Sequence, residues 1–261
     1  MTSPSEPVAA GRSEARLILL SGLGADQRQW EPQRRAFPDA IAPEWAQIES
    51  GEPLAGFARR FGESLPIGPR TVLAGSSFGG MLALEIARQR DVKPACVVLL
   101  GSSRNARAVN PALRAVEWLA RAIPDGVVDR CRWVGLPFVG RGGGISREHR
   151  RLLRQMASEV PVRFLRRAAR AIVEWPGCPD PCVPVRHIHG DRDWVLLLSR
   201  LGAARPDEVV PGGAHVINLS RVERVNAFLA QCIVEAAGRT TAPVAGTSGR
   251  MVPVGSRDDA A

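Results

Sequence analysis

The segment GSSFG at residues 75–79 constrains the fold of this chain more than any other. It fits the pattern Gly-x-Ser-x-Gly, follows a short apolar run at 71–74 and precedes an apolar stretch at 78–90. The first flank predicts a buried strand and the second a mostly buried helix. In so sharp a strand-to-helix turn, side chains two residues before and after the serine would collide, so both positions require glycine. The segment therefore predicts that Ser77 projects its hydroxyl from the end of a strand; the alternative is a glycine-softened connection with an ordinary surface serine.

Apolar, strand-like runs alternate with helix-like stretches on both sides of this segment. Most of these runs are apolar throughout, which is typical of strands buried on both faces of a parallel sheet. We expect strands at 16–21, 40–48, 71–74, 95–100, 183–189 and 207–210, and helices at 29–37, 53–65, 78–90 and 220–236. The pattern predicts an α/β fold with a mostly parallel central sheet flanked by helices, and a site at the carboxyl ends of the strands.

The alternation stops between residues 103 and 180. Three helical stretches are expected there, at 111–122, 146–159 and 162–174, with glycine and proline residues between them. We interpret this region as a helical lid inserted into a single domain at 16–237. Residues 1–15 are predicted to form a flexible leader and residues 238–261 a disordered tail, because small and polar residues dominate both.

The chain carries a formal net charge of +9, and all of its basic residues except Lys93 are arginines. Because the arginines are spread along the chain without an aromatic-basic RNA motif, the sequence does not favour nucleic-acid binding. Arginines do gather on one face of the stretch 162–174. We favour a solvated face for them; the alternative is a docking surface for an acidic carrier protein or for phosphate groups.

The sequence does not favour a membrane protein, a disulfide-rich protein or a metalloprotein. No apolar run approaches the roughly 20 residues of a membrane-spanning helix, and the first residues lack the order of a signal peptide, so a cytoplasmic location is expected. The five cysteines are an odd number and do not predict a disulfide framework. Cys178 and Cys182 have no second pair at zinc-ligand spacing nearby, and we predict neither a metal nor another cofactor.

A serine hydroxyl becomes a useful nucleophile when a base accepts its proton and a carboxylate orients that base. Among the four histidines, His149 falls in an arginine-rich helical stretch and is expected to be exposed. His187 and His189 share one face of a predicted strand, a spacing compatible with a metal, although we favour a structural role. His215 stands in a glycine-rich turn between a strand and a helix, where a loop can carry it over the sheet edge, and it is the predicted base.

Two carboxylates, Asp191 and Asp193, lie between Ser77 and His215 in the sequence, at the end of one predicted strand. Either gives the chain order serine, acid, histidine. The order alone leaves both open as the acid that orients the base.

Four motifs, in order, resemble those of the α/β-hydrolase superfamily. They are SGLGAD at 21–26, GSSFG at 75–79, HGDRD at 189–193 and GGAH at 212–215, and the resemblance spans about residues 16–236 including the lid. It implies that Ser77 is the nucleophile and His215 the base. It also implies Asp193 rather than Asp191 as the acid, because the last aspartate of the His-Gly-x-x-Asp turn usually has that role.

The same resemblance implies an oxyanion hole made by the backbone N–H groups of Leu23 and Phe78. The superfamily usually has His-Gly in the turn after the first of these strands, where this chain has Ser21 and Gly22. That departure changes a supporting residue and removes no donor.

The function that the resemblance implies is a serine hydrolase that cleaves a carboxylic ester through an acyl-enzyme. One alternative is a thioesterase, or a hydrolase of acyl-carrier or coenzyme A esters, as in the similar pimeloyl-carrier methyl esterases. Another is a non-catalytic binding protein of the same fold, although such proteins usually lack a triad member and none is missing here. Because one fold hosts many functions, the substrate is not predicted.

Overall fold

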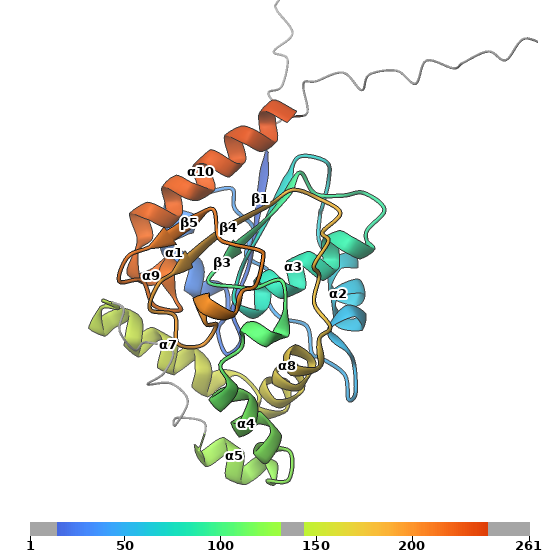
Figure 1. Cartoon of the computed structure of the whole chain (residues 1–261), viewed down its shortest axis with the longest axis vertical. Helices are drawn as coiled ribbons and strands as arrows, with labels where there is room; N and C mark the ends of the chain where they lie inside the picture. Colours follow the sequence, from blue (N-terminus) through green and yellow to red (C-terminus); the bar gives the residue numbers. More distant parts are fainter. Residues whose placement is uncertain (1–14, 132–143, 240–261) are drawn as a thin grey trace, which may run out of the picture.

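The computed structural model describes residues 15–131 and 144–239, in which the chain forms a five-stranded sheet in the order β1-β2-β3-β4-β5 (Figure 1). Each strand pairs with its neighbour in parallel. The strands are β1 Arg16–Leu20, β2 Thr71–Ser76, β3 Cys96–Leu100, β4 Val185–Gly190 and β5 Glu208–Val210. The predicted α/β class with a parallel sheet is therefore confirmed.

Helices cover both faces of this sheet, with α2 and α3 on one side and α1, α9 and α10 on the other (Figure 1). Outside the segment between β3 and β4, the helices and 3-10 turns are η1 Gln27–Trp30, α1 Glu31–Ala36, α2 Leu54–Glu63, α3 Phe78–Gln89, η4 Leu198–Arg200, α9 Ile217–Ser220 and α10 Val222–Arg239. Crossover connections that contain helices allow neighbouring strands to run in the same direction.

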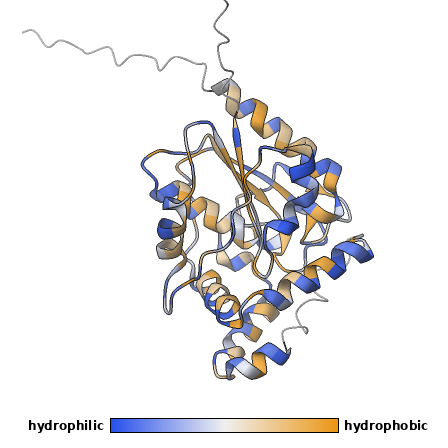
Figure 2. Cartoon of the chain, turned by 180° about the vertical axis from the view of Figure 1, so that it is seen from behind, coloured by the Kyte–Doolittle hydropathy of each residue, from blue (hydrophilic) through white to orange (hydrophobic). Residues whose placement is uncertain are grey.

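The strands are apolar on both faces because each face packs against helices. In β1, Ile18 and Leu20 point into the core beneath α2 and α3, whereas Leu17 and Leu19 point into the core beneath α10. This alternation follows from the two-residue repeat of a strand. Figure 2 accordingly shows the strands largely in the hydrophobic colour, while the surrounding helices are striped. The two apolar layers hold the sheet rigidly, so the positions of its strand ends are well defined.

The segment between β3 and β4 leaves the sheet and forms a helical insertion at the bottom of Figure 1, below the ends of the strands. Its described elements are η2 Ala106–Ala108, α4 Pro111–Ala120, α5 Asp125–Cys131, α7 Arg147–Glu159 and α8 Val162–Glu174. The Asn110 side chain caps α4 by accepting from the Ala112 N–H, and Ser146 caps α7 by accepting from the His149 N–H. The insertion confirms helices at all three expected places and adds α5, which the sequence analysis missed.

One predicted strand is wrong. Residues 40–48 form no strand: Ile41 makes a single parallel bridge to Ile18, and Pro43 follows two residues later. A proline removes the N–H that a continuing ladder needs. The helix expected at 220–236 is present as α10. The short α9 precedes it, and its last residue, Ser220, donates its hydroxyl to the Val216 carbonyl.

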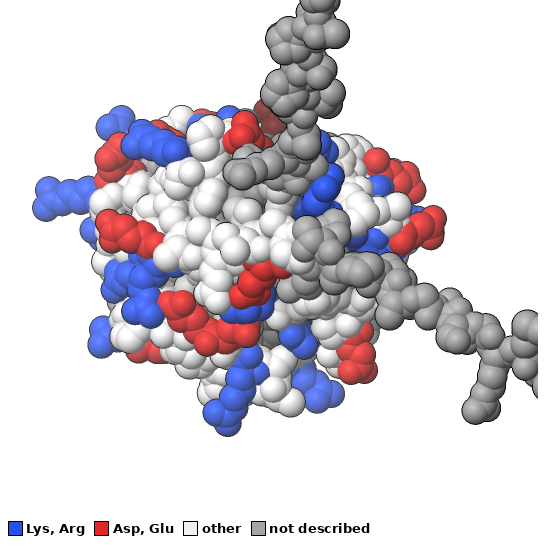
Figure 3. Space-filling view, turned by 90° about the horizontal axis from the view of Figure 1, so that it is seen from above, with Lys and Arg blue, Asp and Glu red and all other residues white. Residues whose placement is uncertain are grey.

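The predicted leader and tail lie almost entirely outside the described residues. None of the helices in residues 15–131 and 144–239 is long and apolar enough to cross a membrane. On the face away from the insertion, arginine and acidic side chains are interspersed (Figure 3). That face therefore shows no broad surface of a single charge, in spite of the net charge of +9.

Candidate active site

The loops that follow four parallel strands meet at one edge of the sheet, which we call the carboxyl edge. Leu23 follows β1, Ser77 follows β2, Asp193 follows β4 and His215 follows β5. These are the strand-end residues that the sequence analysis singled out. Parallel strands bring such residues together because their carboxyl ends share one edge.

Ser77 lies in a strained turn between β2 and α3. Its φ is 51°, and it is the only non-glycine residue with a positive φ among the described residues. A Cβ on Gly75 would lie 2.2 Å from the Gly79 carbonyl carbon, and a Cβ on Gly79 would lie 2.2 Å from the Leu20 carbonyl oxygen. Both distances are far inside contact, so the two glycines permit a conformation that other residues could not share. Such strain is typical of functional sites.

Ser102, directly beyond β3, supports this turn in a way that the sequence analysis did not predict. Its hydroxyl donates to the Ser77 carbonyl oxygen at 2.6 Å, and the side chain is fully buried. Gly80 leaves the room for it, because a Cβ there would lie 2.4 Å from the Ser102 Oγ. The sequence signal was its place at a strand end, but nothing local indicated its acceptor.

A continuous chain of hydrogen bonds joins the three predicted side chains. His215 Nε2 lies 2.9 Å from the Ser77 Oγ, and His215 Nδ1 lies 2.8 Å from the Asp193 Oδ2. A carboxylate only accepts, so the imidazole proton sits on Nδ1 and Nε2 is left as an acceptor for the serine hydroxyl. This is the tautomer that a general base needs.

The carboxylate of Asp193 is buried, and both of its oxygens accept hydrogen bonds. Its Oδ1 accepts from the N–H groups of Val195 and Leu196, each at 2.8 Å. Burial raises the pKa of Asp193, but the charge and hydrogen bond of His215, together with His189 and the Leu196 amide, outweigh it and hold the pKa below its ordinary value. Asp191, the alternative acid, is exposed and its N–H donates to the Val210 carbonyl.

His187 and His189 form a buried pair behind this acid. Their ring nitrogens Nε2 and Nδ1 are 3.2 Å apart, and His189 Nε2 donates to the Leu196 carbonyl at 2.9 Å while lying 3.4 Å from the Asp193 Oδ2. Burial, reinforced by His189, lowers the pKa of His187 to about 3. Burial also lowers the pKa of His189, against the opposing charge of Asp193. The pair is therefore neutral and structural at neutral pH, and His149 lies apart from it on α7.

The turn after β1 passes directly beside the serine. A Cβ on Gly22 would lie 3.8 Å from the Ser77 Cβ, and Leu23 is the next residue of this turn. Phe78 is the first residue of α3, so its N–H has no acceptor within that helix. The turn that carries Leu23 thus passes beside Ser77, and the Phe78 N–H follows the serine directly in the chain.

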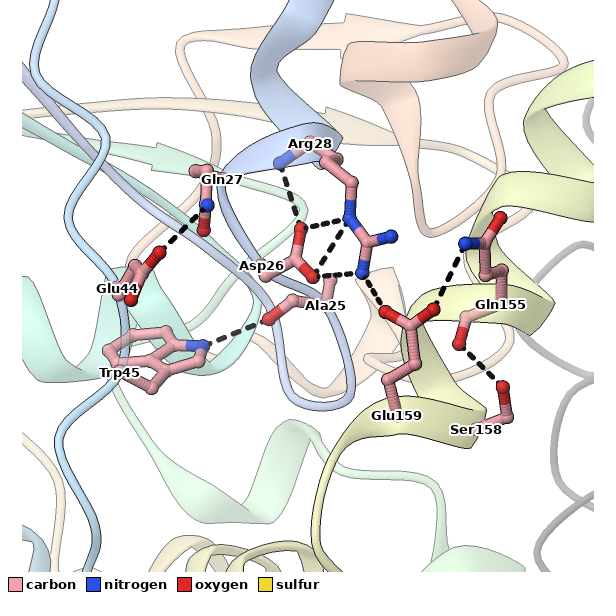
Figure 4. Close-up of polar contacts among 9 residues, drawn as sticks. All are labelled: Ala25, Asp26, Gln27, Arg28, Glu44, Trp45, Gln155, Ser158 and Glu159. Atoms are coloured by element: carbon pink, nitrogen blue, oxygen red, sulfur yellow. Dashed lines mark hydrogen bonds and ion pairs between the residues drawn. The ribbon is translucent and has the colours of Figure 1, made fainter.

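On its outer side, the same turn contacts the helical insertion (Figure 4). The Arg28 guanidinium binds both oxygens of Asp26 and also reaches Glu159 at the end of α7. The Trp45 indole N–H donates to the Ala25 carbonyl at 3.0 Å. These contacts border a surface hollow of about 290 Å³ whose apolar wall includes Trp45 and Phe164.

Comparison with known proteins agrees with this geometry. A family model for the alpha/beta hydrolase family matches residues 17–228. The chain belongs to this family. The match includes all five strands and the four predicted motifs, so the resemblance and the fold expected from it are both confirmed. No curated protein matches the sequence.

Solved structures of α/β hydrolases share the fold at low identity. A thermophilic esterase from Thermogutta terrifontis is 19% identical over 85% of this chain and 90% of its own, with a TM-score of 0.63. MenH from S. aureus is 15% identical over 85% and 94%, with a TM-score of 0.65. A bromoperoxidase from Bacillus anthracis is 18% identical over 85% and 92%, with a TM-score of 0.66. At such identities these neighbours establish the fold and leave the substrate open.

Residues 15–131 and 144–239 contain no group of three or more histidine, cysteine or carboxylate side chains arranged to bind a metal. The buried pair His187 and His189 is satisfied by its own hydrogen bonds. At the carboxyl edge, hydrogen bonds bring Ser77, His215 and Asp193 together.

Proposed function

We propose that this α/β hydrolase cleaves a carboxylic ester by acyl-enzyme chemistry, with Ser77, His215 and Asp193 as its catalytic triad. The observation that carries the proposal is the unbroken hydrogen-bond chain from Asp193 Oδ2 through His215 to the Ser77 Oγ, at 2.8 and 2.9 Å. Distances in this range allow direct proton transfer between the hydroxyl and the imidazole.

In the first half of the reaction, Ser77 Oγ attacks the carbonyl carbon while its proton passes to His215 Nε2. The carbonyl oxygen becomes an oxyanion, which accepts hydrogen bonds from the Leu23 and Phe78 N–H groups. Asp193 stabilises the imidazolium through Nδ1. The intermediate then collapses, the bond to the alcohol oxygen breaks, and that oxygen takes the proton from Nε2 as it leaves.

The second half repeats these steps with water. His215 Nε2 accepts a proton from a water molecule whose oxygen attacks the acyl carbon. The resulting oxyanion occupies the same two donors. Collapse breaks the bond to Ser77 Oγ, which recovers its proton from Nε2, and the carboxylic acid departs. Atoms and charge balance over the cycle, and the enzyme returns to its starting state.

A second candidate is a thioester or an acyl-carrier ester, favoured by the charge of α7. Four exposed arginines, with no ion pair among the described residues, repeat at helical spacing along this helix: Arg147, Arg150, Arg151 and Arg154. A phosphorylated or acidic carrier would pair with them and would bind less tightly as salt rises. An uncharged ester would not respond in this way.

The direct test is hydrolysis of a panel of esters and thioesters of increasing acyl length by the wild type and by Ser77→Ala. We expect at least one ester to turn over, with a loss of at least about 10³-fold in Ser77→Ala and an unchanged circular dichroism spectrum. Full activity in Ser77→Ala would reject the assignment of the nucleophile. Repeating the assay at 0.05 and 0.5 M NaCl separates the two substrate classes through KM.

A further inference from the structure

A buried network of side-chain amides joins the two loops on either side of Ser77. The Gln29 Oε1 accepts from the Gly22 N–H at 2.9 Å, in the turn that carries the Leu23 donor. The Gln29 Nε2 donates to the Asn218 Oδ1 at 3.2 Å, and Asn218 stands three residues after His215. The same asparagine donates from Nδ2 to the Gln29 carbonyl at 3.0 Å.

Only one orientation of the two amides satisfies all three hydrogen bonds. The Gly22 N–H requires an oxygen, so the Gln29 nitrogen must face Asn218. The Asn218 oxygen must then face that nitrogen, which leaves its own nitrogen for the Gln29 carbonyl. A flip of either group would set donor against donor or acceptor against acceptor. The network therefore fixes the orientation of both side-chain amides.

This network is shielded from water, which makes its geometry costly to disturb. Gln29 is 2% exposed and Asn218 is fully buried. A buried amide that loses its partner keeps the full cost of desolvation, so a satisfied network of this kind favours one arrangement strongly. The loop that carries His215 and the turn that carries Leu23 are thus held in fixed relation.

We propose that Gln29 and Asn218 are positioning residues that fix the Leu23 oxyanion donor relative to His215 and Ser77. The proposal rests on the function proposed above and adds to it the part that sets the geometry of the site. Neither side chain touches substrate. Gln29 acts through the Gly22–Leu23 backbone, and Asn218 acts by orienting Gln29 and by tying the His215 loop to η1.

The chain supplies a matched control in Gln33, one turn further along in α1. Its Nε2 donates to the Asn218 carbonyl and to the Asn226 Oδ1, both at 3.1 Å, and it is fully buried. It therefore shares the burial and the amide chemistry of Gln29, but its hydrogen bonds in the described part of the chain go to Asn218 and Asn226 and not to the turn after β1. A merely structural role would give the two residues the same behaviour.

The test compares Gln29→Met with Gln33→Met, since methionine keeps the length of glutamine without its polar atoms. We expect Gln29→Met to lower kcat by about 10- to 100-fold with KM within about threefold, because a displaced oxyanion donor weakens transition-state binding. Gln33→Met is expected to lower the melting temperature and leave kcat within about twofold of the wild type. The rate of Ser77 phosphonylation should follow kcat in both variants.

Asn218→Leu supplies a second route if Gln29→Met fails to fold, since it removes the partner and leaves Gln29 in place. Asn218→Leu should also lower kcat. The double variant Gln29→Met/Asn218→Leu should show a smaller fold-loss in kcat than the product of the two single losses. The proposal is overturned if folded Gln29→Met or Asn218→Leu keeps kcat within about twofold, or if Gln33→Met loses as much as they do. Activity that depends on Ser77 but not on Gln29 would reject this inference alone, whereas activity independent of Ser77 would reject the proposed function as well.

Discussion

The carboxyl edge and the helical insertion hold their polar groups in opposite ways. At the edge, Asp193 and Gln29 are almost fully buried and bind named partners through directional hydrogen bonds. In the insertion, polar groups are mostly exposed; the pair Arg163 and Asp125, for example, leaves 76% and 47% of its side chains in solvent. Buried hydrogen bonds fix the geometry of the groups that they join, whereas exposed ion pairs contribute little to the stability of the fold.

The helices of the two regions differ in the same sense. In α3, every residue from Phe78 to Ala87 is buried, and the helix start fixes Ser77. In α4, no residue is buried, and Val116, Trp118 and Leu119 are exposed. The rigid region is thus the one that carries the proposed chemistry. The exposed surface of α4 can therefore change at small cost to the fold.

Replacing Asp193 should give the largest loss of activity, because this carboxylate is part of the buried hydrogen-bond chain at the carboxyl edge. We expect Asp193→Asn to lower kcat/KM by on the order of 10³- to 10⁴-fold, since the amide favours the wrong imidazole tautomer while keeping the shape. The matched variant is Asp191→Asn, an exposed residue two positions away, which should stay within about twofold. Ester hydrolysis assays measure both. A reversed outcome would make Asp191 the acid.

Two glycine substitutions should separate the regions by stability. Gly79→Ala places a Cβ 2.2 Å from the Leu20 carbonyl oxygen, and we expect a loss of about 3 kcal/mol or more in the free energy of unfolding. Gly126→Ala in α5 meets no atom within 4 Å and should change stability by less than about 1 kcal/mol, on the favourable side. Urea denaturation of both variants measures the contrast. Equal losses would mean that the elbow is not sterically constrained.

The buried histidine pair predicts how stability depends on pH. The folded-state pKa of His187 is about 3 against an ordinary value of 6.5. Above pH 6.5 the group is neutral in both states; below it the unfolded chain is protonated first, so stability is lost as the pH falls towards 3. The slope due to this group is about 1.4 kcal/mol per pH unit. His187→Gln should reduce the slope by that amount in urea melts between pH 4 and 6, and an unchanged slope would contradict it.

The smallest effect is expected where the insertion meets the turn. Glu159→Gln weakens the link from α7 to Arg28, whose partners all reach solvent. We expect kcat to change by less than about threefold at low salt, and the difference to vanish near 1 M NaCl because salt screens exposed pairs. Glu174→Gln, which breaks the pairs with Arg121 and Arg170 elsewhere in the insertion, serves as the control. A large loss that salt does not remove would place the link within the rigid region.

The same contrast explains what the sequence could predict. Ser77 and His215 each stand in a short local motif at a strand end, which was enough to predict that they share one edge. The pattern left Asp191 and Asp193 open as the acid, and the family resemblance chose Asp193. The strand expected at 40–48 failed because a strand needs a partner along its length, and only Ile41 finds one. Apolar alternation carries no information about that partner.

Contacts between distant residues had no local signal at all. Gln29 and Asn218 are 189 positions apart, and Arg28 and Glu159 are 131 apart. From sequence alone, a glutamine or asparagine in a helical stretch is expected on the surface. Whether it is buried depends on how two loops come together in the folded chain. Ser102 follows the strand expected at 95–100, but its bond to the Ser77 carbonyl follows from the packing of β2 beside β3.

The most direct test of the central claim, that the carboxyl edge holds an activated serine beside an oxyanion hole, is reaction of the folded wild type with a fluorophosphonate followed by intact-mass analysis and peptide mapping. We predict one adduct per chain, on Ser77, formed far more slowly in His215→Ala. No adduct on the folded protein, or an adduct on a serine other than Ser77, would contradict the account.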